Sequence, residues 1–344
     1  MRRLLWLAGA VAAIGALLFG WQAWRFLTTP VNVPQEGSTF EIAPGTPFVA
    51  VSRALAERGI LEHPRLFTLY ARARGQGSAI HAGEYSLEPG ITPSELLAKF
   101  VAGEVLLHSF TIVEGWTFRE LLANLSRQEA IASTLEYEDW PRLMEELGAD
   151  AERPEGLFLP ETYRYAKHTT DVQLLTRAYA LMQKTLDAEW NERAPDLPLG
   201  SKYEALILAS IVEKETARAD ERARIAGVFV RRLRKNMRLQ TDPTVIYGIG
   251  EAFDGNLTRA DLRTDTPYNT YTRRSLPPTP IAMPGRASIH AALHPEPGEE
   301  LYFVASGRGD GSHIFSVTKA EHDAAVLEYL ARLREAGKRR EQVR

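Results

Sequence analysis

Residues 208–250 read LASIVEKETARADERARIAGVFVRRLRKNMRLQTDPTVIYGIG. Apolar residues recur at helical spacing in its first part, which predicts helices around residues 203–216 and 220–235. We interpret the last part, residues 238–250, as a strand-and-turn segment that carries many hydrogen-bonding groups. Helices that alternate with such polar segments indicate an α+β domain.

Two glutamates stand near the end of the first of these helices. Leu208, Ile211 and Val212 share one helix face, and Glu215 extends it. The usual interpretation of a glutamate within a helix is a solvated charge. A carboxylate on an apolar face is costly to bury, however, so its pKa would rise, as a general acid requires. Glu213 lies about 200° away around the axis, so the two cannot form a catalytic pair.

Further segments extend the same domain in both directions along the chain. Helices are expected around residues 174–192 and 320–335. Residues 155–165 predict strand and turn, and residues 266–285 contain too many prolines for a helix or a central strand. Residues 300–317 predict a hairpin, because two alternating apolar runs flank a glycine-rich turn. We expect the long loops of this domain to converge on a groove.

The region before residue 137 repeats one pattern three times. Each copy has a short alternating strand, a turn centred on a glycine, and an amphipathic helix whose expected N-cap is a threonine. The spacing is irregular, so this is a recurrent design and not a solenoid. The three pairs of turn glycine and N-cap threonine are Gly45 and Thr46, Gly90 and Thr92, and Gly115 and Thr117.

The N-terminus predicts a membrane anchor. Residues 4–24 contain one polar side chain, Gln22, and as a helix they would span roughly 30 Å, the thickness of a bilayer core. Arg2 and Arg3 would stay cytoplasmic by the positive-inside rule. A cleaved signal peptide is the alternative, but no small-residue cleavage site follows the apolar stretch.

Composition excludes several classes of function. The 344 residues suffice for one large or two modest domains. A formal net charge of −3 offers no basic surface for nucleic acid. With no cysteine there are no disulfides, thiolate metal sites or cysteine nucleophiles. A serine hydrolase is not indicated, because the chain has no Gly-x-Ser-x-Gly motif.

The long stretch quoted first closely resembles the signature of the YceG (MltG) family of membrane-anchored endolytic murein transglycosylases. The resemblance continues through EGLFLPETY, YNTYTRRSLPPTPIAMPG and LYFVASGRGDGSHIFS. It implies lytic cleavage of the β-1,4 bond between N-acetylmuramic acid and N-acetylglucosamine, with a 1,6-anhydro product and no cofactor or metal. The family's catalytic glutamate corresponds to Glu215, and one carboxylate suffices because no water enters the reaction.

The resemblance also implies residues that contact the sugar. Amides can bond sugar hydroxyls and N-acetyl groups, and tyrosine offers a flat apolar face with a polar tip. Local scaffolding of turns is the alternative role for each of them. This chain departs from the family at Glu161, Thr279 and Met283, where Asp, Gly and Asn are usual. The expected substrate-binding residues are Gln240, Tyr268, Asn269, Thr216, Glu161 and Tyr163.

The expected organisation is α+β with a single N-terminal transmembrane helix. It comprises a cytoplasmic stub, an anchor, a linker, a lobe that resembles LysM glycan-binding domains, a catalytic domain like that of lytic transglycosylases, and a charged tail. A plain scaffold lobe is the alternative for the LysM-like part. The boundaries are 1–3, 4–26, 27–38, 39–108, 109–336 and 337–344.

The expected location is the cell inner membrane, with the N-terminus cytoplasmic and the catalytic domain outside the cytoplasm. The resemblance implies peptidoglycan strands as substrate, and penicillin-binding proteins and other murein synthases as partners. Two alternatives remain. One is a non-catalytic anchored scaffold that binds glycan. The other is a zinc-dependent amidase or peptidase that uses His290 and His294, although no catalytic glutamate follows His290.

Overall fold

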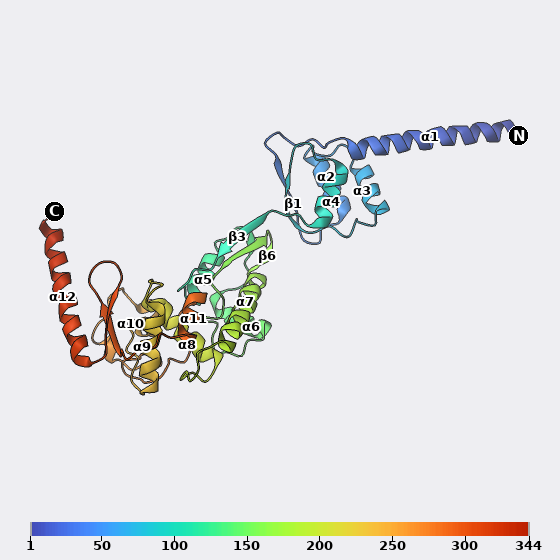
Figure 1. Ribbon diagram of the computed structural model, residues 1–344. Helices are drawn as coiled ribbons and strands as arrows, with labels where there is room; N and C mark the ends of the chain where they lie inside the picture. Colours follow the sequence, from blue (N-terminus) through green and yellow to red (C-terminus); the bar gives the residue numbers. More distant parts are fainter. Residues whose placement is uncertain (1, 343–344) are drawn as a thin grey trace. The chain divides into compact units, whose positions relative to one another are not determined.

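The computed structural model describes residues 2–342, apart from the side chains of 2–5, 7–9, 11, 12, 16 and 336–342 (Figure 1). The fold is mixed α+β, as predicted, with small two-stranded sheets among helices. The chain divides into two compact units. The first comprises Met1–Ser109, Glu129–Ala132 and Arg164–Thr169, and the second comprises Phe110–Gln128, Ser133–Tyr163 and Thr170–Arg344.

The first unit packs three helices on an antiparallel pair of strands. Strand β1 pairs with β2 so that Ser38 faces Leu87 and Ile42 faces Gly83. The core is aromatic, and the ring of Tyr85 meets that of Phe100 edge-on at 4.7 Å. The elements are α1 (Arg2–Thr28), β1 (Ser38–Ile42), α2 (Phe48–Glu57), α3 (Pro64–Ala73), β2 (Gly83–Leu87), α4 (Pro93–Ala102) and β3 (Leu107–Thr111), the last of which runs into the second unit.

Two of the three predicted threonine caps are confirmed. Thr92 begins α4 and Thr117 begins α5 (Phe118–Leu125), each in a capping box with the glutamate three residues later. The prediction for Thr46 is wrong, because α2 begins one residue later and Pro47 occupies its N-cap. Thr46 instead closes the preceding turn, where its N–H donates to Ala43 O over 3.2 Å.

The segment between α1 and β1, where a linker is predicted, is hydrogen-bonded to the rest of the first unit. Val31 N donates to Ile91 O over 2.8 Å, and Asn32 N donates to Ile60 O over 3.0 Å. These backbone bonds hold the segment after α1 against the rest of the first unit.

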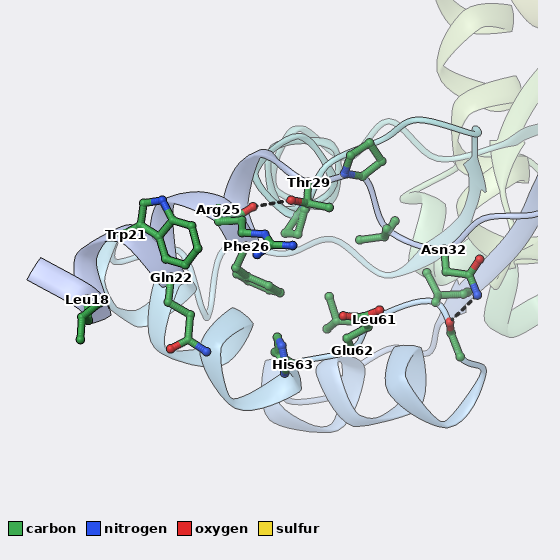
Figure 2. A pocket seen from close by; sticks show the side chains of 15 residues that line it. Leu18, Trp21, Gln22, Arg25, Phe26, Thr29, Asn32, Leu61, Glu62 and His63 are labelled. Carbon is green, nitrogen blue, oxygen red and sulfur yellow. Dashed lines mark hydrogen bonds between the residues drawn. The ribbon is translucent and has the colours of Figure 1, made fainter. Parts of the chain in front are cut away.

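A cavity of about 750 Å³ opens beside the end of α1 in the first unit (Figure 2). Trp21, Arg25 and Phe26 of α1 line one side, and Leu61 and His63 line the other. Among the described residues, no helix is both long enough and apolar enough to cross a membrane. The anchor over residues 4–26 therefore stays a prediction.

The second unit places one helix at its centre. Helix α8 is buried from Ala205 through Val212 and packs against α7, α9, α10 and α11. Strand β4 (Ile131–Ala132) belongs to the first unit, and β5 (Thr162–Ala166) and β6 (Thr169–Thr170) each have residues in both units. The remaining elements are α6 (Trp140–Leu147), α7 (Asp171–Asn191), α8 (Lys202–Glu215), α9 (Arg222–Arg234), α10 (Asp242–Ile249), α11 (Arg286–Leu293), β7 (Tyr302–Ala305), β8 (His313–Ser316), α12 (Lys319–Gln342) and three 3₁₀ turns at Tyr137–Asp139, Gly250–Ala252 and Asp261–Arg263.

One predicted segment is wrong and two others are confirmed. Residues 238–250 form no strand in the described chain, because α10 begins at Asp242 with Pro243 in its first turn, where proline is favoured. Residues 266–285 form neither helix nor strand in the same part of the structure, as expected. The hairpin is confirmed, with β7 and β8 antiparallel and Phe303 opposite Phe315.

Candidate active site

Glu215 is the last residue of α8, and its side chain is only partly exposed. The chain turns out of the helix at Thr216, whose backbone is extended, with φ −146° and ψ 134°. The Thr216 hydroxyl accepts a hydrogen bond from Arg218 N at 3.0 Å and so stabilises this turn. The carboxyl group thus stands where a buried helix ends.

A chain of threonine hydroxyls holds the Glu215 carboxylate. Thr241, just before α10, donates a short hydrogen bond to Glu215 Oε1. Its own backbone N–H donates to Thr270 Oγ1 over 3.1 Å, and Thr270 lies 2.9 Å from the hydroxyl of Thr244. All three threonines are buried, so side-chain hydrogen bonds fix the orientation of the carboxylate.

The environment raises the pKa of Glu215 to about 7. Burial is the main cause, since it penalises the charged form. The hydrogen bond from Thr241 lowers the pKa, and the charge of Asp242 raises it. The charges of His313 and Arg232 also lower the pKa. A large share of the molecules therefore carry a proton on Glu215 at neutral pH, as a general acid must.

Arg232 fixes the segment that carries Thr241. Its guanidinium is 6% exposed and donates to the carbonyl oxygens of Leu239, at 2.5 Å, and Leu301, at 2.6 Å. Nearby, Tyr271 donates to Asp242 Oδ1 over 2.5 Å, and burial raises the pKa of this tyrosine.

A histidine–glutamate pair lies on the β8 side of the site. His313 Nδ1 is 2.7 Å from Glu221 Oε2, and its backbone N–H donates to the other oxygen of the same carboxylate over 3.0 Å. The imidazole also meets the ring of Phe303 edge-on. Glu221 therefore fixes both the backbone and the ring of His313.

Of the predicted sugar contacts, Gln240 and Thr216 adjoin this network in sequence. Gln240 is exposed and immediately precedes Thr241. Its backbone lies in the left-handed region, with φ 52°, which is strained for a residue other than glycine. Its N–H donates to Thr270 O over 3.2 Å. The strain is maintained by the same loop that holds Thr241.

Tyr268 and Asn269 serve the loop that carries Thr270. Asn269 is buried, and its amide nitrogen donates to the carbonyl oxygens of Asp261 and Thr264 over 3.1 and 2.7 Å. These bonds use the amide within the loop, so the predicted direct contact with sugar has no support in this geometry. Tyr268 is half-buried, and its hydroxyl lies 2.9 Å from that of Thr279.

Glu161 and Tyr163 have hydrogen bonds that do not reach the Glu215 network. The Glu161 carbonyl accepts from Ile112 N, and its exposed carboxylate accepts from Thr162 N. Tyr163 is buried, and its hydroxyl donates to Leu159 O over 2.7 Å. The contact of these two residues with sugar stays a prediction.

Glu213 is no solvated charge either. Its side chain is 7% exposed, accepts from Gly285 N over 2.9 Å and lies 3.8 Å from the Arg222 guanidinium. The exposed Glu114 approaches the same guanidinium at 3.9 Å. Glu213 thus belongs to a structural charge cluster, whereas Glu215 belongs to the threonine network.

Sequence reasoning missed a second buried carboxyl group, Glu155. It accepts from Phe118 N over 2.9 Å and from the Tyr247 hydroxyl over 3.0 Å. Burial raises its pKa to about 8. Sequence reasoning also missed Thr241, although the helix start at Asp242 and Pro243 marks it as the N-cap position.

Comparisons with known proteins agree on one family. A model described as the YceG-like family matches residues 40–328. A Bacillus subtilis (strain 168) protein named endolytic murein transglycosylase is 29% identical over 335 residues, which cover 92% of this chain and 91% of that protein. A Streptococcus pneumoniae (serotype 2, strain D39) protein of the same name is 27% identical over 326 residues, covering 85% of this chain but 58% of that longer protein.

Among solved structures, the chain is similar to a crystal structure described as a yceG-like protein from Listeria monocytogenes. The two are 28% identical with a TM-score of 0.52, and the match covers 85% of this chain and 99% of the other.

Proposed function

This chain belongs to the YceG-like family, and from that membership we infer that it is an endolytic murein transglycosylase, a lyase that cuts peptidoglycan strands internally. The observation that supports this assignment most strongly is the carboxyl group of Glu215. It lies at the end of a buried helix, held by a hydrogen bond from Thr241, with its pKa raised to about 7.

Glu215 acts first as an acid and then as a base. Its proton passes to the oxygen of the β-1,4 bond as that bond breaks at the muramyl anomeric carbon. The carboxylate so formed takes the proton of the muramyl 6-hydroxyl while that oxygen attacks the same carbon. A 1,6-anhydro ring closes, the carboxyl group is restored, and no water is consumed. A pKa near neutrality suits both steps.

The threonine network suits a carboxyl group that changes charge twice in each turnover. Thr241 donates to Glu215, and this hydrogen bond is strongest when the group is ionised. Because Thr241 is itself held through Thr270, the carboxylate does not need to reorient between the two steps.

The test is digestion of purified murein by the full-length protein in detergent, with products identified by mass spectrometry. We expect muropeptides that end in 1,6-anhydro-N-acetylmuramic acid. Glu215→Gln should reduce their formation by at least about 100-fold, the usual contribution of an acid–base group. Glu213→Gln is the matched control, because it keeps an acceptor for Gly285 N and lies outside the threonine network.

Two results would contradict this function. Normal turnover by Glu215→Gln would remove the proposed acid. Saturable binding of murein without anhydro products would favour the non-catalytic scaffold. Circular dichroism and melting curves of both variants establish that they are folded.

We also propose that residues 4–26 anchor the protein in the cell inner membrane, with the catalytic unit outside the cytoplasm. The support is the apolar N-terminal sequence after Arg2 and Arg3. An anchored enzyme would act on new strands close to the membrane, next to penicillin-binding proteins and other murein synthases. The first unit resembles LysM domains in its pattern of β-strand, turn and helix, and it would hold the glycan strand.

A further inference from the structure

Three potential metal ligands meet where α7 passes the end of α11. His290 lies in α11, His294 caps its C-terminus, and Glu189 comes from the last turns of α7. His290 Nδ1 is 2.8 Å from Glu189 Oε2, and His294 Nδ1 is 3.9 Å from the same oxygen. All three ligand atoms lie within 4.8 Å of one another.

The hydrogen bonds of His294 leave one ring nitrogen facing acceptors. His294 Nε2 is 2.8 Å from Glu192 O, and a carbonyl oxygen can only accept, so Nε2 carries the hydrogen. His294 Nδ1 lies 3.2 Å from His290 O, to which it is hydrogen-bonded, and 3.9 Å from Glu189 Oε2. To bind a metal ion beside Glu189, Nδ1 would exchange the bond with His290 O for a bond to the ion.

The same hydrogen bond is the usual support of a metal-bound histidine. Such a residue generally donates its second ring N–H to a backbone carbonyl or a carboxylate, which fixes the tautomer and the plane of the ring. Glu192 O provides that support here. His290 is 59% exposed on its side chain, so its Nε2 can donate to water when Nδ1 binds a metal.

We propose that Glu189, His290 and His294 form a zinc site. Two imidazole nitrogens and one carboxylate oxygen are ligands that zinc prefers, and water would complete a tetrahedron. Bonds of about 2.0–2.1 Å require ligand atoms roughly 3.3 Å apart. The rings of His290 and His294 are stacked with their centroids 4.2 Å apart, so zinc binding requires the imidazoles to turn until both Nδ1 atoms point at one ion. No cysteine competes for the ion in this chain.

The site is structural and separate from catalysis. It joins α7 to α11, and α11 packs against α8, the helix that ends in Glu215. None of its three ligands takes part in the hydrogen bonds that hold Glu215. Zinc would therefore stabilise the helices around the catalytic residue without contacting substrate.

The experiment is titration of the tag-free, full-length protein in detergent with zinc sulfate. Isothermal calorimetry measures stoichiometry and affinity, and a melting curve measures stabilisation. We expect one zinc ion per chain at micromolar concentration and a higher melting temperature. His290→Asn, His294→Asn and Glu189→Gln should each weaken binding by at least about tenfold.

Glu192→Gln is the matched control, because it changes an exposed carboxylate three residues from Glu189 and leaves the carbonyl that supports His294. It should bind zinc like the parent protein. The proposal is overturned if no saturable binding occurs, as expected if His294 is doubly protonated and donates to both carbonyl oxygens. It is also overturned if the three variants bind as tightly as Glu192→Gln. His290 is exposed, so its variant should fold and keep the test decisive.

Discussion

The carboxyl group of Glu215 lies among groups that shift its pKa in opposite directions. Burial and Asp242 favour the protonated form, whereas the Thr241 hydroxyl, His313 and Arg232 favour the charged form. Most of these groups come from elements remote in sequence from α8. A substitution at one of these groups should therefore shift the pH dependence of cleavage. The direction follows from whether that group raises or lowers the pKa of Glu215.

Thr241→Val should move the alkaline limit of kcat/KM to higher pH. The protonated form of Glu215 is the active acid, so activity falls as pH rises through its pKa, about 7. Removing a donor that stabilises the carboxylate raises this pKa further. Valine has nearly the same shape, so packing is kept. The measurement is the pH profile of murein cleavage.

Thr244→Val serves as the control for this substitution. Its hydroxyl belongs to the same network but bonds Thr241 O and Thr270, not Glu215. Its alkaline limit should match that of the parent protein. A shift to lower pH in Thr241→Val would show that Thr241 does not stabilise the charged form.

Glu155 is expected to make stability depend on pH. Its pKa of about 8 in the folded protein lies above its ordinary value of 4.5. The stabilisation by the protonated form is complete below pH 4.5 and is lost as pH rises to about 8. Over that range the free energy of unfolding falls by about 1.4 kcal/mol per pH unit.

Glu155→Gln should therefore melt at a higher temperature than the parent protein at pH 9, and differ less from it at pH 6. Glutamine mimics the protonated carboxyl group and still accepts from Phe118 N. Glu161→Gln, which changes an exposed carboxylate, should follow the parent protein at both pH values. Equal differences at pH 6 and pH 9 would show that Glu155 does not titrate in this range.

At the scale of single elements, a short sequence signal predicts the start of a helix correctly where one capping residue decides it. Thr92 and Thr117 cap their helices because each is followed, three residues later, by a glutamate that completes the capping box. Residues 238–250 also contain a signal for the start of a helix, Asp242 followed by Pro243. The β-branched residues after them favoured a strand, but tertiary packing of α10 against α8 overrides that preference.

Thr92→Ala should destabilise α4 by about 1 kcal/mol, because the cap hydrogen bond to Glu95 N is lost. Thr46→Ala should have little effect on α2, since Pro47 and not Thr46 occupies that N-cap. Hydrogen exchange with mass spectrometry measures local opening of each helix in the full chain. Equal acceleration of exchange in α2 and α4 would contradict the assignment of the caps.

At the scale of the whole molecule, α1 is joined to the rest of the first unit by more than a flexible linker. Ser94 Oγ donates to Leu27 O over 3.1 Å, and Asn32 Nδ2 donates to Gly59 O over 3.2 Å. With the backbone bonds of Val31 and Asn32, these contacts hold the segment after α1 against the unit. An anchor at α1 would therefore keep the first unit at the membrane surface.

The proposed anchor predicts how the full chain behaves in cells. It should remain in the membrane pellet after an alkaline carbonate wash, because an apolar helix is removed only by detergent. Protease added to intact spheroplasts should degrade both units and spare an epitope placed before Arg2. Release by carbonate, or degradation of the units only after lysis, would exclude an anchor with the N-terminus inside.

The sequence by itself determined the α+β class, most helices of the second unit, the hairpin, two helix caps and the position of Glu215 on an apolar face. These features depend on periodicity and on signals a few residues apart. Only the tertiary structure decided what surrounds Glu215, because Thr241, its partner Thr270 and the charge of His313 come from separate segments. It also turned Asn269 inward and buried Glu155, since burial and hydrogen bonding depend on contacts that chain order does not record.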